Sequence, residues 1–170
     1  MNRITSTLLL LSVLPSFSLA ANYQEVIKYR EMVNNVPEDK FHNTIKFLEK
    51  DEEEIGRTGT TIEYMRNGDV QIKPSGNATV WTKSVSIKDR PKDKLIKGDI
   101  VKTQMEVNCD TYEMAILAQV VHRKTETIRY EHFPNPIFSP VVPDTFGASF
   151  ANRTCLVKFM IDRLDKLGMH

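Results

Sequence analysis

The chain has 170 residues, and its 23 Lys and Arg residues nearly balance its 22 Asp and Glu residues, which gives a formal net charge of +1 at pH 7. A nucleic-acid partner is therefore not expected, because phosphate binding normally needs a clear excess of basic residues. After residue 20, no segment is long and apolar enough to span a membrane. The remaining length of about 150 residues suits one domain with its own core.

Residues 1–20 are typical of a cleavable signal peptide. Arg3 precedes a short apolar run over residues 8–14, and the small residues Ser18 and Ala20 occupy the positions that signal peptidase reads. The apolar run is roughly half as long as a membrane-spanning helix. No cysteine follows the expected cut after Ala20, so a lipid anchor is not indicated. We expect the mature chain to be exported from the cytoplasm.

Residues 21–58 are predicted to form an N-terminal helical region. A first helix over residues 22–34 carries its apolar side chains near one side, and Pro37 suits the first turn of a second helix. Residues 38–54 hold seven acidic and three basic side chains, which is typical of a solvated face.

From Thr60 onward, apolar and polar residues alternate, which predicts strands. The dipeptide Asn67-Gly68 predicts a hairpin turn, after which the chain returns through Val70 and Ile72. Residues 74–77 predict a second turn, and a strand with the single tryptophan of the sequence is expected over residues 79–87.

Residues 88–99 are polar and contain Pro91 and Gly98, so they are predicted to form a loop. The clearest strand follows over residues 101–109, where alternation places Cys109 on the buried face together with the apolar side chains. A long strand over residues 112–122 and a shorter one over residues 127–131 complete the expected sheet.

Four prolines make residues 133–143 an extended linker along an edge or end of the sheet. A C-terminal helix is predicted to start near Pro143-Asp144. Its apolar stripe comprises Phe146, Phe150, Val157, Met160, Ile161 and Leu164. Cys155 falls nearly opposite this stripe, so either the helix bends near Cys155 or its two halves face the sheet differently.

The two cysteines, Cys109 and Cys155, both lie in the predicted mature chain. An oxidising compartment favours a disulfide between them, and no Cys-x-x-Cys spacing indicates a redox-active pair. We therefore predict one structural disulfide.

The segment around these cysteines resembles the surface-adhesin protein E family of Gram-negative bacteria. The resemblance depends on Asn108-Cys109-x-x-Tyr112, the upstream Val80-Trp81, and Pro143-Asp144-Thr145 with Cys155 twelve residues after the proline. It covers roughly residues 60–160. It implies an α+β fold in which about six antiparallel strands are covered by a C-terminal helix, so that residues 59–170 form an adhesin-E-like domain.

The same resemblance implies a function at the cell surface or in the periplasm. A known member of the family binds host vitronectin and laminin and can dimerise. Its basic binding segment matches residues 94–123 here, where the basic residues are Lys94, Lys97, Lys102 and Arg123. This chain departs from the pattern because the segment is less basic, the lipid-anchor cysteine is missing and an N-terminal helical region is added.

The sequence predicts neither an enzyme nor a cofactor. A nucleophile elbow, a phosphate-binding glycine loop and a paired acid–base arrangement are all missing from it. The histidines are His42, His122, His132 and His170, and none has the paired spacing of a metal site.

The basic loop is the main candidate for a binding site. Residues 83–102 carry a local charge of +4, whereas residues 38–54 carry −4. The predicted partner-binding residues are Lys88, Arg90, Lys92, Lys94, Lys97, Lys102 and Arg123. They are expected to contact an acidic protein or a heparin-like glycan. Two alternatives remain: a solvated loop whose lysines protect a sheet edge, or charged segments that face each other within the fold or between two copies.

The sequence thus predicts an exported, non-enzymatic, adhesin-like domain that binds a host matrix or serum protein. One alternative is a periplasmic immunity protein that neutralises a toxin through its acidic segment, residues 38–54. Another is an envelope assembly factor whose N-terminal helices pack on a partner.

Overall fold

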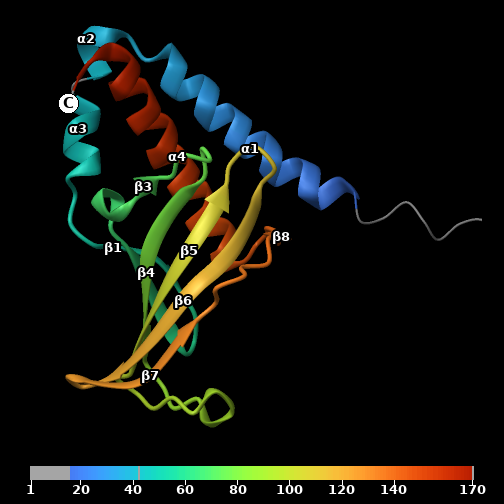
Figure 1. Cartoon of the computed structure of the whole chain (residues 1–170), viewed down its shortest axis with the longest axis vertical. Coiled ribbons are helices and arrows are strands. Elements are labelled where there is room, and N and C mark those ends of the chain that lie inside the picture. The colour runs from blue at the N-terminus through green and yellow to red at the C-terminus, as the bar shows by residue number, and fades with distance from the viewer. Residues whose placement is uncertain (1–15, 42, 170) are drawn as a thin grey trace, which may run out of the picture.

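The computed structural model describes residues 16–41 and 43–169, which form an antiparallel sheet with helices on one face (Figure 1). The helices are α1 (Ser16–Asn35), α2 (Glu38–Phe41), α3 (Asn43–Leu48) and α4 (Phe146–Leu167). Short 3-10 helices occupy Asn67–Asp69 and Pro91–Asp93. The two long helices, α1 and α4, pack side by side in the upper half of the view.

Six strands form the main sheet, in the order β1-β2-β4-β5-β6-β7, and every pairing is antiparallel. The strands are β1 (Glu53–Arg57), β2 (Thr61–Met65), β4 (Ala78–Ser86), β5 (Ile100–Asn108), β6 (Glu113–Arg123) and β7 (Glu126–His132). Two short strands join it: β3 (Gln71–Ile72) pairs with β4, and β8 (Ser139–Pro140) pairs with β6. The predicted α+β fold, with a sheet of about six strands and helices at both ends of the chain, is confirmed.

Helix α4 is buried on two sides, which explains the position of Cys155. Phe150 and Val157 pack against the sheet in one hydrophobic cluster, whereas Ala151 and Cys155 belong to a second cluster that includes α1 residues. A helix that lies between a sheet and another helix needs apolar residues on both faces. The position of Cys155 therefore requires neither a bend in the helix nor two halves that face the sheet differently. Thr145 caps the start of α4 by accepting a hydrogen bond from the Ala148 N–H, at 3.2 Å.

The predicted disulfide is present between Cys109, just after β5, and Cys155 in α4. Both sulfur-bearing residues are buried in the cluster shared with α1. Next to them, the Tyr112 hydroxyl donates to the Asn152 side chain at 2.7 Å, and Asn152 donates to Glu25 of α1 at 3.1 Å. Burial, together with the nearby Glu25 carboxylate, raises the pKa of Tyr112 to about 12. The disulfide, α1 and α4 thus form one joined layer.

Helix α1 contains the helix that the sequence predicts and extends it toward the N-terminus. Val26 and Val33 are buried against α4, so the N-terminal helix packs on the rest of the fold. The charged start and the apolar run of the predicted signal peptide lie in residues 1–15, outside the described residues. Because α1 begins at Ser16, it includes the last five residues before the expected cut.

Two predictions about the segment before β4 are wrong. Asn67-Gly68 forms a 3-10 helix rather than a hairpin turn, and β2 pairs with β4 instead of β3. The Asn67 side chain explains the difference, because it donates to the Phe47 carbonyl at 2.8 Å and accepts from the Arg153 Nε at 2.9 Å. These tertiary bonds override the local turn preference. In addition, residues 53–57, expected to be helical, form the edge strand β1.

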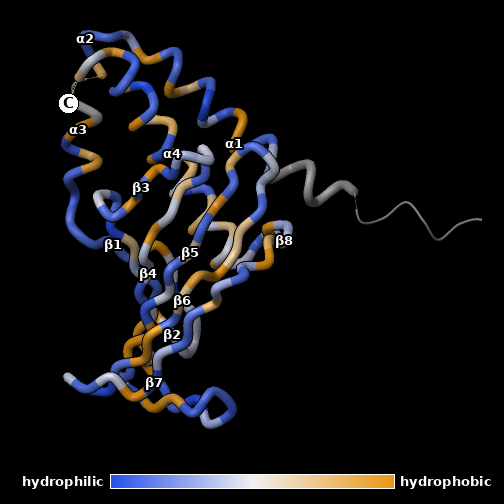
Figure 2. Tube along the Cα trace, viewed as in Figure 1, coloured by the Kyte–Doolittle hydropathy of each residue, from blue (hydrophilic) through white to orange (hydrophobic). Residues whose placement is uncertain are grey.

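The lower half of the sheet extends beyond α4 and is here called the arm; it comprises residues 61–63, 82–86, 100–104 and 118–132 (Figure 1). Hydrophobic residues continue along its strands to the lower end, below the helices (Figure 2). The predicted 88–99 loop closes this end, where Leu95 packs on Val101 and Val121. The arm therefore has one surface on the helix side, the inner face, and an opposite surface, the outer face.

Candidate functional site

The outer face of the sheet carries an aromatic and basic row. Tyr64, Lys83, Lys102, Val120 and Tyr130 are successive cross-strand neighbours from β2 to β7. The described helices lie on the other side of the sheet (Figure 1). An antiparallel sheet with one solvated face normally presents polar residues there, so this row is unusual for a face that only contacts water.

Lys83 and Lys102 are directly opposite each other on adjacent strands. Like charges in this position destabilise a sheet, because their Cβ atoms lie about 5 Å apart. Glu52 offsets part of the repulsion through an ion pair with Lys83, whose ammonium also lies 4.6 Å from the centre of the Tyr64 ring. Lys102 is exposed and makes no ion pair or hydrogen bond to another described residue. Within the described residues, Lys102 is therefore a cation without an ion-pair partner, although the carboxylates of Glu52 and Asp69 line the same groove.

A shallow groove of about 470 Å³ surrounds this lysine pair, and Trp81 and Val120 form part of its lining. Near it, β7 is an exposed edge strand: Tyr130 is 63% exposed and Ile128 is 44% exposed. Aromatic residues are enriched in protein interfaces, and a carboxylate placed between the two lysines would relieve their repulsion. We call Tyr64, Trp81, Lys83, Lys102, Val120 and Tyr130 the outer patch.

The structure divides the binding residues that the sequence predicts. Lys88, Lys92, Lys94 and Lys97 are exposed on the loop at the lower end. That loop packs on the inner face through Leu95, whereas Lys102 projects from the outer face, because neighbouring strand residues alternate. The loop lysines and Lys102 therefore do not form a single patch.

The guanidinium groups of Arg90 and Arg123 are both engaged in ion pairs within the chain. Arg90 binds Asp93 within the loop, with an Nε to Oδ2 distance of 2.8 Å. Arg123 donates to both carboxylate oxygens of Asp99, at 2.9 and 2.7 Å, and Asp99 is only 1% exposed. The hydrogen bonds from Arg123 hold the pKa of Asp99 below its ordinary value, against the effect of burial. Arg123 thus fixes the base of the loop, so we no longer place it at the partner surface.

The aromatic members of the outer patch could not be recognised from the sequence. Tyr64, Trp81 and Tyr130 were placed on strands, but single strands do not reveal which residues stand next to each other across a sheet. The pairing register brings them together. The outer residues of β5 from Lys102 to Asn108 are all polar, so no apolar pattern within that strand marked the outer face.

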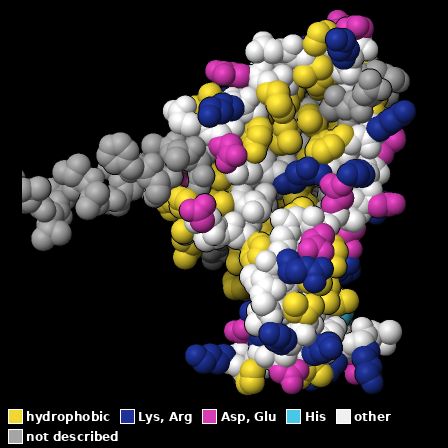
Figure 3. Space-filling model, turned by 180° about the vertical axis from the view of Figure 1, so that it is seen from behind, with side chains coloured by type: hydrophobic (Ala, Val, Ile, Leu, Met, Phe, Trp, Pro, Cys, Tyr) yellow, Lys and Arg dark blue, Asp and Glu magenta, His cyan; other side chains and the backbone are white. Residues whose placement is uncertain are grey.

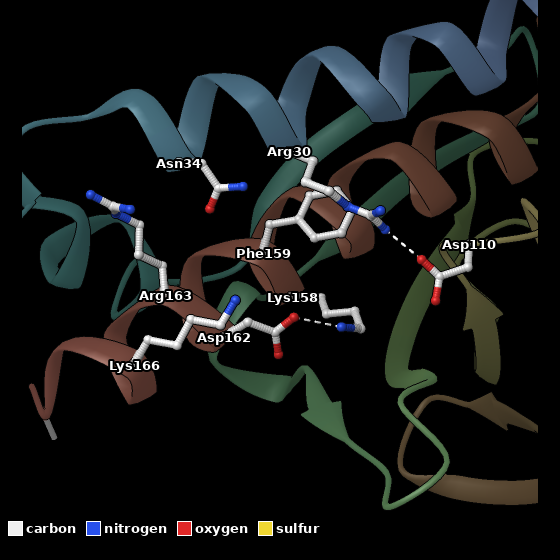
Figure 4. A pocket seen from close by; sticks show the side chains of 8 residues that line it. All are labelled: Arg30, Asn34, Asp110, Lys158, Phe159, Asp162, Arg163 and Lys166. Atoms are coloured by element: carbon white, nitrogen blue, oxygen red, sulfur yellow. Dashed lines mark hydrogen bonds and ion pairs between the residues drawn. The ribbon is translucent and has the colours of Figure 1, made fainter.

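A second hollow, of about 260 Å³, lies between α1 and α4 (Figure 4). Its cations are largely engaged: Arg30 pairs with Asp110 and lies 4.7 Å from the centre of the Phe159 ring, and Lys158 pairs with Asp162 at 2.6 Å. These contacts join α1, α4 and the turn after β5. We interpret this hollow as part of the joint between the helices.

The described residues contain neither a metal-binding cluster nor a helix that could cross a bilayer. Within residues 16–41 and 43–169, no group of three or more His, Cys, Asp or Glu side chains is arranged to hold a metal ion. His122 and His132 lie on β6 and β7, whereas His42 and His170 lie outside the described residues. No helix in the described part of the chain is long and apolar enough to cross a bilayer.

Comparisons with family models, with curated proteins and with solved structures found no match to this chain. The resemblance to the adhesin family therefore stays a prediction, and functional proposals depend on the geometry of the chain itself.

Proposed function

We propose that this protein is an exported, non-enzymatic binding domain whose outer patch recognises an acidic segment of another protein. The observation that carries the proposal is the exposed Lys102, which lies opposite Lys83 within an aromatic row on a sheet face without a helix over it. A glutamate or aspartate of a partner would bind between the two ammonium groups, while apolar side chains beside it would contact Trp81 and Tyr130.

Export is supported by the disulfide, since such bonds persist mainly in oxidising compartments. The signal-peptide pattern of residues 1–20 points the same way. Together with the adhesin resemblance, these features favour the periplasm or cell surface as the location and a host matrix or serum protein, such as vitronectin or laminin, as the partner.

The immunity-protein alternative gains nothing from the geometry. Its docking surface was the acidic segment 38–54, but three of those carboxylates form ion pairs inside the chain: Glu52 with Lys83, Glu53 with Lys50 and Arg153, and Glu54 with Arg57. The contact between Glu52 and Lys83 instead favours the idea that the acidic and basic segments face each other within the fold. An assembly factor that binds through its N-terminal helices is also less favoured, because α1 packs on α4.

The test compares two variants with the same change of charge, Lys102→Glu on the outer patch and Lys92→Glu on the loop. Immobilised wild-type protein and both variants are exposed side by side to purified vitronectin, purified laminin, serum and an extract of the organism's own periplasm. We expect Lys102→Glu to weaken retention of the partner about tenfold or more, because it replaces attraction by repulsion in a desolvated contact. Lys92→Glu should change it less than about twofold.

Salt and fold controls accompany this comparison. Retention by the wild type should fall as ionic strength rises. Lys92→Glu should unfold at the same urea concentration as the wild type, and Lys102→Glu at the same or a higher one, because it replaces a like-charge pair with Lys83 by an opposite-charge pair. A larger loss for Lys92→Glu would move the binding site to the loop, and equal losses would show general charge attraction instead of recognition by the outer patch. Retention that is the same for all three proteins at low salt would remove the outer patch from consideration.

A further inference from the structure

The inner face of the arm contains a third hollow, a cleft of about 490 Å³. Ser84, Val101 and Thr103 lie on its floor, on the central strands β4 and β5. Glu63 of β2 and Arg129 of β7 stand on opposite sides, Arg90 and Leu95 of the loop close the lower end, and Phe146 at the start of α4 closes the upper end. The volume falls within the range of small-molecule sites, about 300–1,000 Å³.

This cleft is more polar than a sheet face next to a core usually is. Figure 3, which views the helix side, shows uncharged polar side chains and backbone between charged and apolar side chains on the arm below the helices. The hydroxyls of Ser84 and Thr103 and the amide of Gln119 all line the cleft. Each of these groups can both donate and accept hydrogen bonds.

Two of the charged groups retain bonding capacity. Glu63 is only 6% exposed, and Ser84 donates to one of its carboxylate oxygens, whereas the other oxygen has no hydrogen bond from the described residues. The Arg129 Nε is buried and makes no hydrogen bond within the described chain. Its ion-pair partner, the Glu131 carboxylate, lies 3.5 Å away. A buried polar atom such as the Arg129 Nε normally has a partner. Together with the second Glu63 oxygen, which receives no hydrogen bond from the described residues, it indicates a place where a ligand can bind.

The balance of charged side chains around the cleft favours a neutral ligand. The carboxylates of Glu63 and Asp93 balance the guanidinium groups of Arg90 and Arg129 around the cleft, which favours neither an anion nor a cation. Glu63 and Arg129 are separated by four inter-strand spacings, about 19 Å along the sheet. This separation is too long for the ammonium and carboxylate groups of one amino acid. An elongated neutral ligand with several hydroxyl groups can span this distance, with one hydroxyl donating to Glu63 and another accepting from Arg129.

We propose that the inner cleft binds a short neutral oligosaccharide, whose hydroxyls donate to Glu63 and accept from Arg129 across a floor of Ser84 and Thr103. One face of a sugar ring would pack against Phe146 at the upper end. This site is independent of the outer patch, since Thr103 and Lys102 are neighbours that point to opposite faces of β5.

The test is a titration of the isotope-labelled chain, followed by backbone amide NMR shifts, with millimolar maltotriose, N,N′,N″-triacetylchitotriose and 3′-sialyllactose as probes. Triglycine serves as a zwitterionic probe of similar length. We expect at least one of the two neutral trisaccharides to shift amides at Glu63, Thr103 and Arg129. We expect Glu63→Gln and Arg129→Lys each to weaken that binding about tenfold, because each removes a hydrogen bond to a charged group.

Lys102→Ala, on the opposite face of the same strand, is the control and should leave the affinity unchanged. Glu63→Gln keeps the size of the side chain, and matching urea midpoints will exclude misfolding as the cause of a loss. No shifts with either neutral sugar would overturn the proposal. So would shifts outside the cleft, or tighter binding of sialyllactose or triglycine than of the neutral sugars.

Discussion

Removal of the disulfide tests how strongly α4 is held on the sheet by a covalent bond rather than by packing. Cys109 and Cys155 are 46 residues apart in the sequence. In the chain-entropy treatment, a cross-link over such a loop lowers the entropy of the unfolded chain and stabilises the fold by about 4 kcal/mol. The variant Cys109→Ala/Cys155→Ala should lose about this much free energy of unfolding, or slightly more, because both cysteines are buried and their sulfur atoms fill space in the shared cluster.

Urea denaturation measures the effect, with the fluorescence of the single tryptophan, Trp81, and far-ultraviolet circular dichroism as probes. The denaturant slope should also rise, because an unfolded chain without the cross-link exposes more surface. Reductant provides the control: it should destabilise the wild type by a similar amount and leave the double alanine variant unaffected. A loss below about 1 kcal/mol would refute this reasoning, since it would mean that the unfolded chain gains little freedom when the loop opens.

Two further predictions concern single side chains. Gly56→Ala would place a methyl group against the Phe146 ring, whose Cδ1 lies 2.9 Å from the added Cβ, and should lower the free energy of unfolding by about 1–3 kcal/mol. Gly59→Ala is the matched control. It has nothing within 4 Å of its Cβ and should be nearly neutral in the same urea assay. Asp99→Asn should cost about 2 kcal/mol near neutral pH. Since the pKa of Asp99 is lowered in the folded state, that cost should persist above about pH 4, the ordinary value for an unfolded aspartate, and vanish as the pH falls through the folded pKa. A gap between the wild type and Asp99→Asn that does not change between neutral and acidic pH would contradict the assigned ion pair with Arg123.

Much of the fold was accessible from sequence periodicity. The strand through Val107, the long strand β6 and both long helices follow from alternating or helical spacing, and the disulfide follows from the two cysteines of an exported chain; the structure confirms all of them. The errors occur where distant side chains decide the local conformation. Asn67 resembles a turn residue, yet its side chain bonds to Phe47 and Arg153, which are remote in the sequence. Strand β1 is short, polar and interrupted by an irregularity between Glu54 and Gly56, so its period was not visible.

The candidate sites were predicted less well, because both depend on register across several strands. The sequence placed the binding charges in one basic loop, but the fold uses Arg123 to anchor that loop and turns Lys102 to the opposite face. Glu63 was part of the polar side of an alternating strand, and such residues usually contact water. The pairing of β2 with β4 places Glu63 beside Ser84 instead. Single-strand patterns contain no information about such neighbours.

The uneven cover of the sheet by α4 has a consequence for its motions. In the upper half, Val80 and Val107 lie under the helices, whereas the lower end of the arm is held by the small cluster around Leu95 and by the ion pair of Arg123 with Asp99. Local opening should therefore need less free energy at the ends of β4 and β6 near residues 86 and 123 than near residues 80 and 114. Amide hydrogens should therefore exchange fastest at the lower end of each strand and more slowly toward the disulfide, so that the sheet opens from one end only.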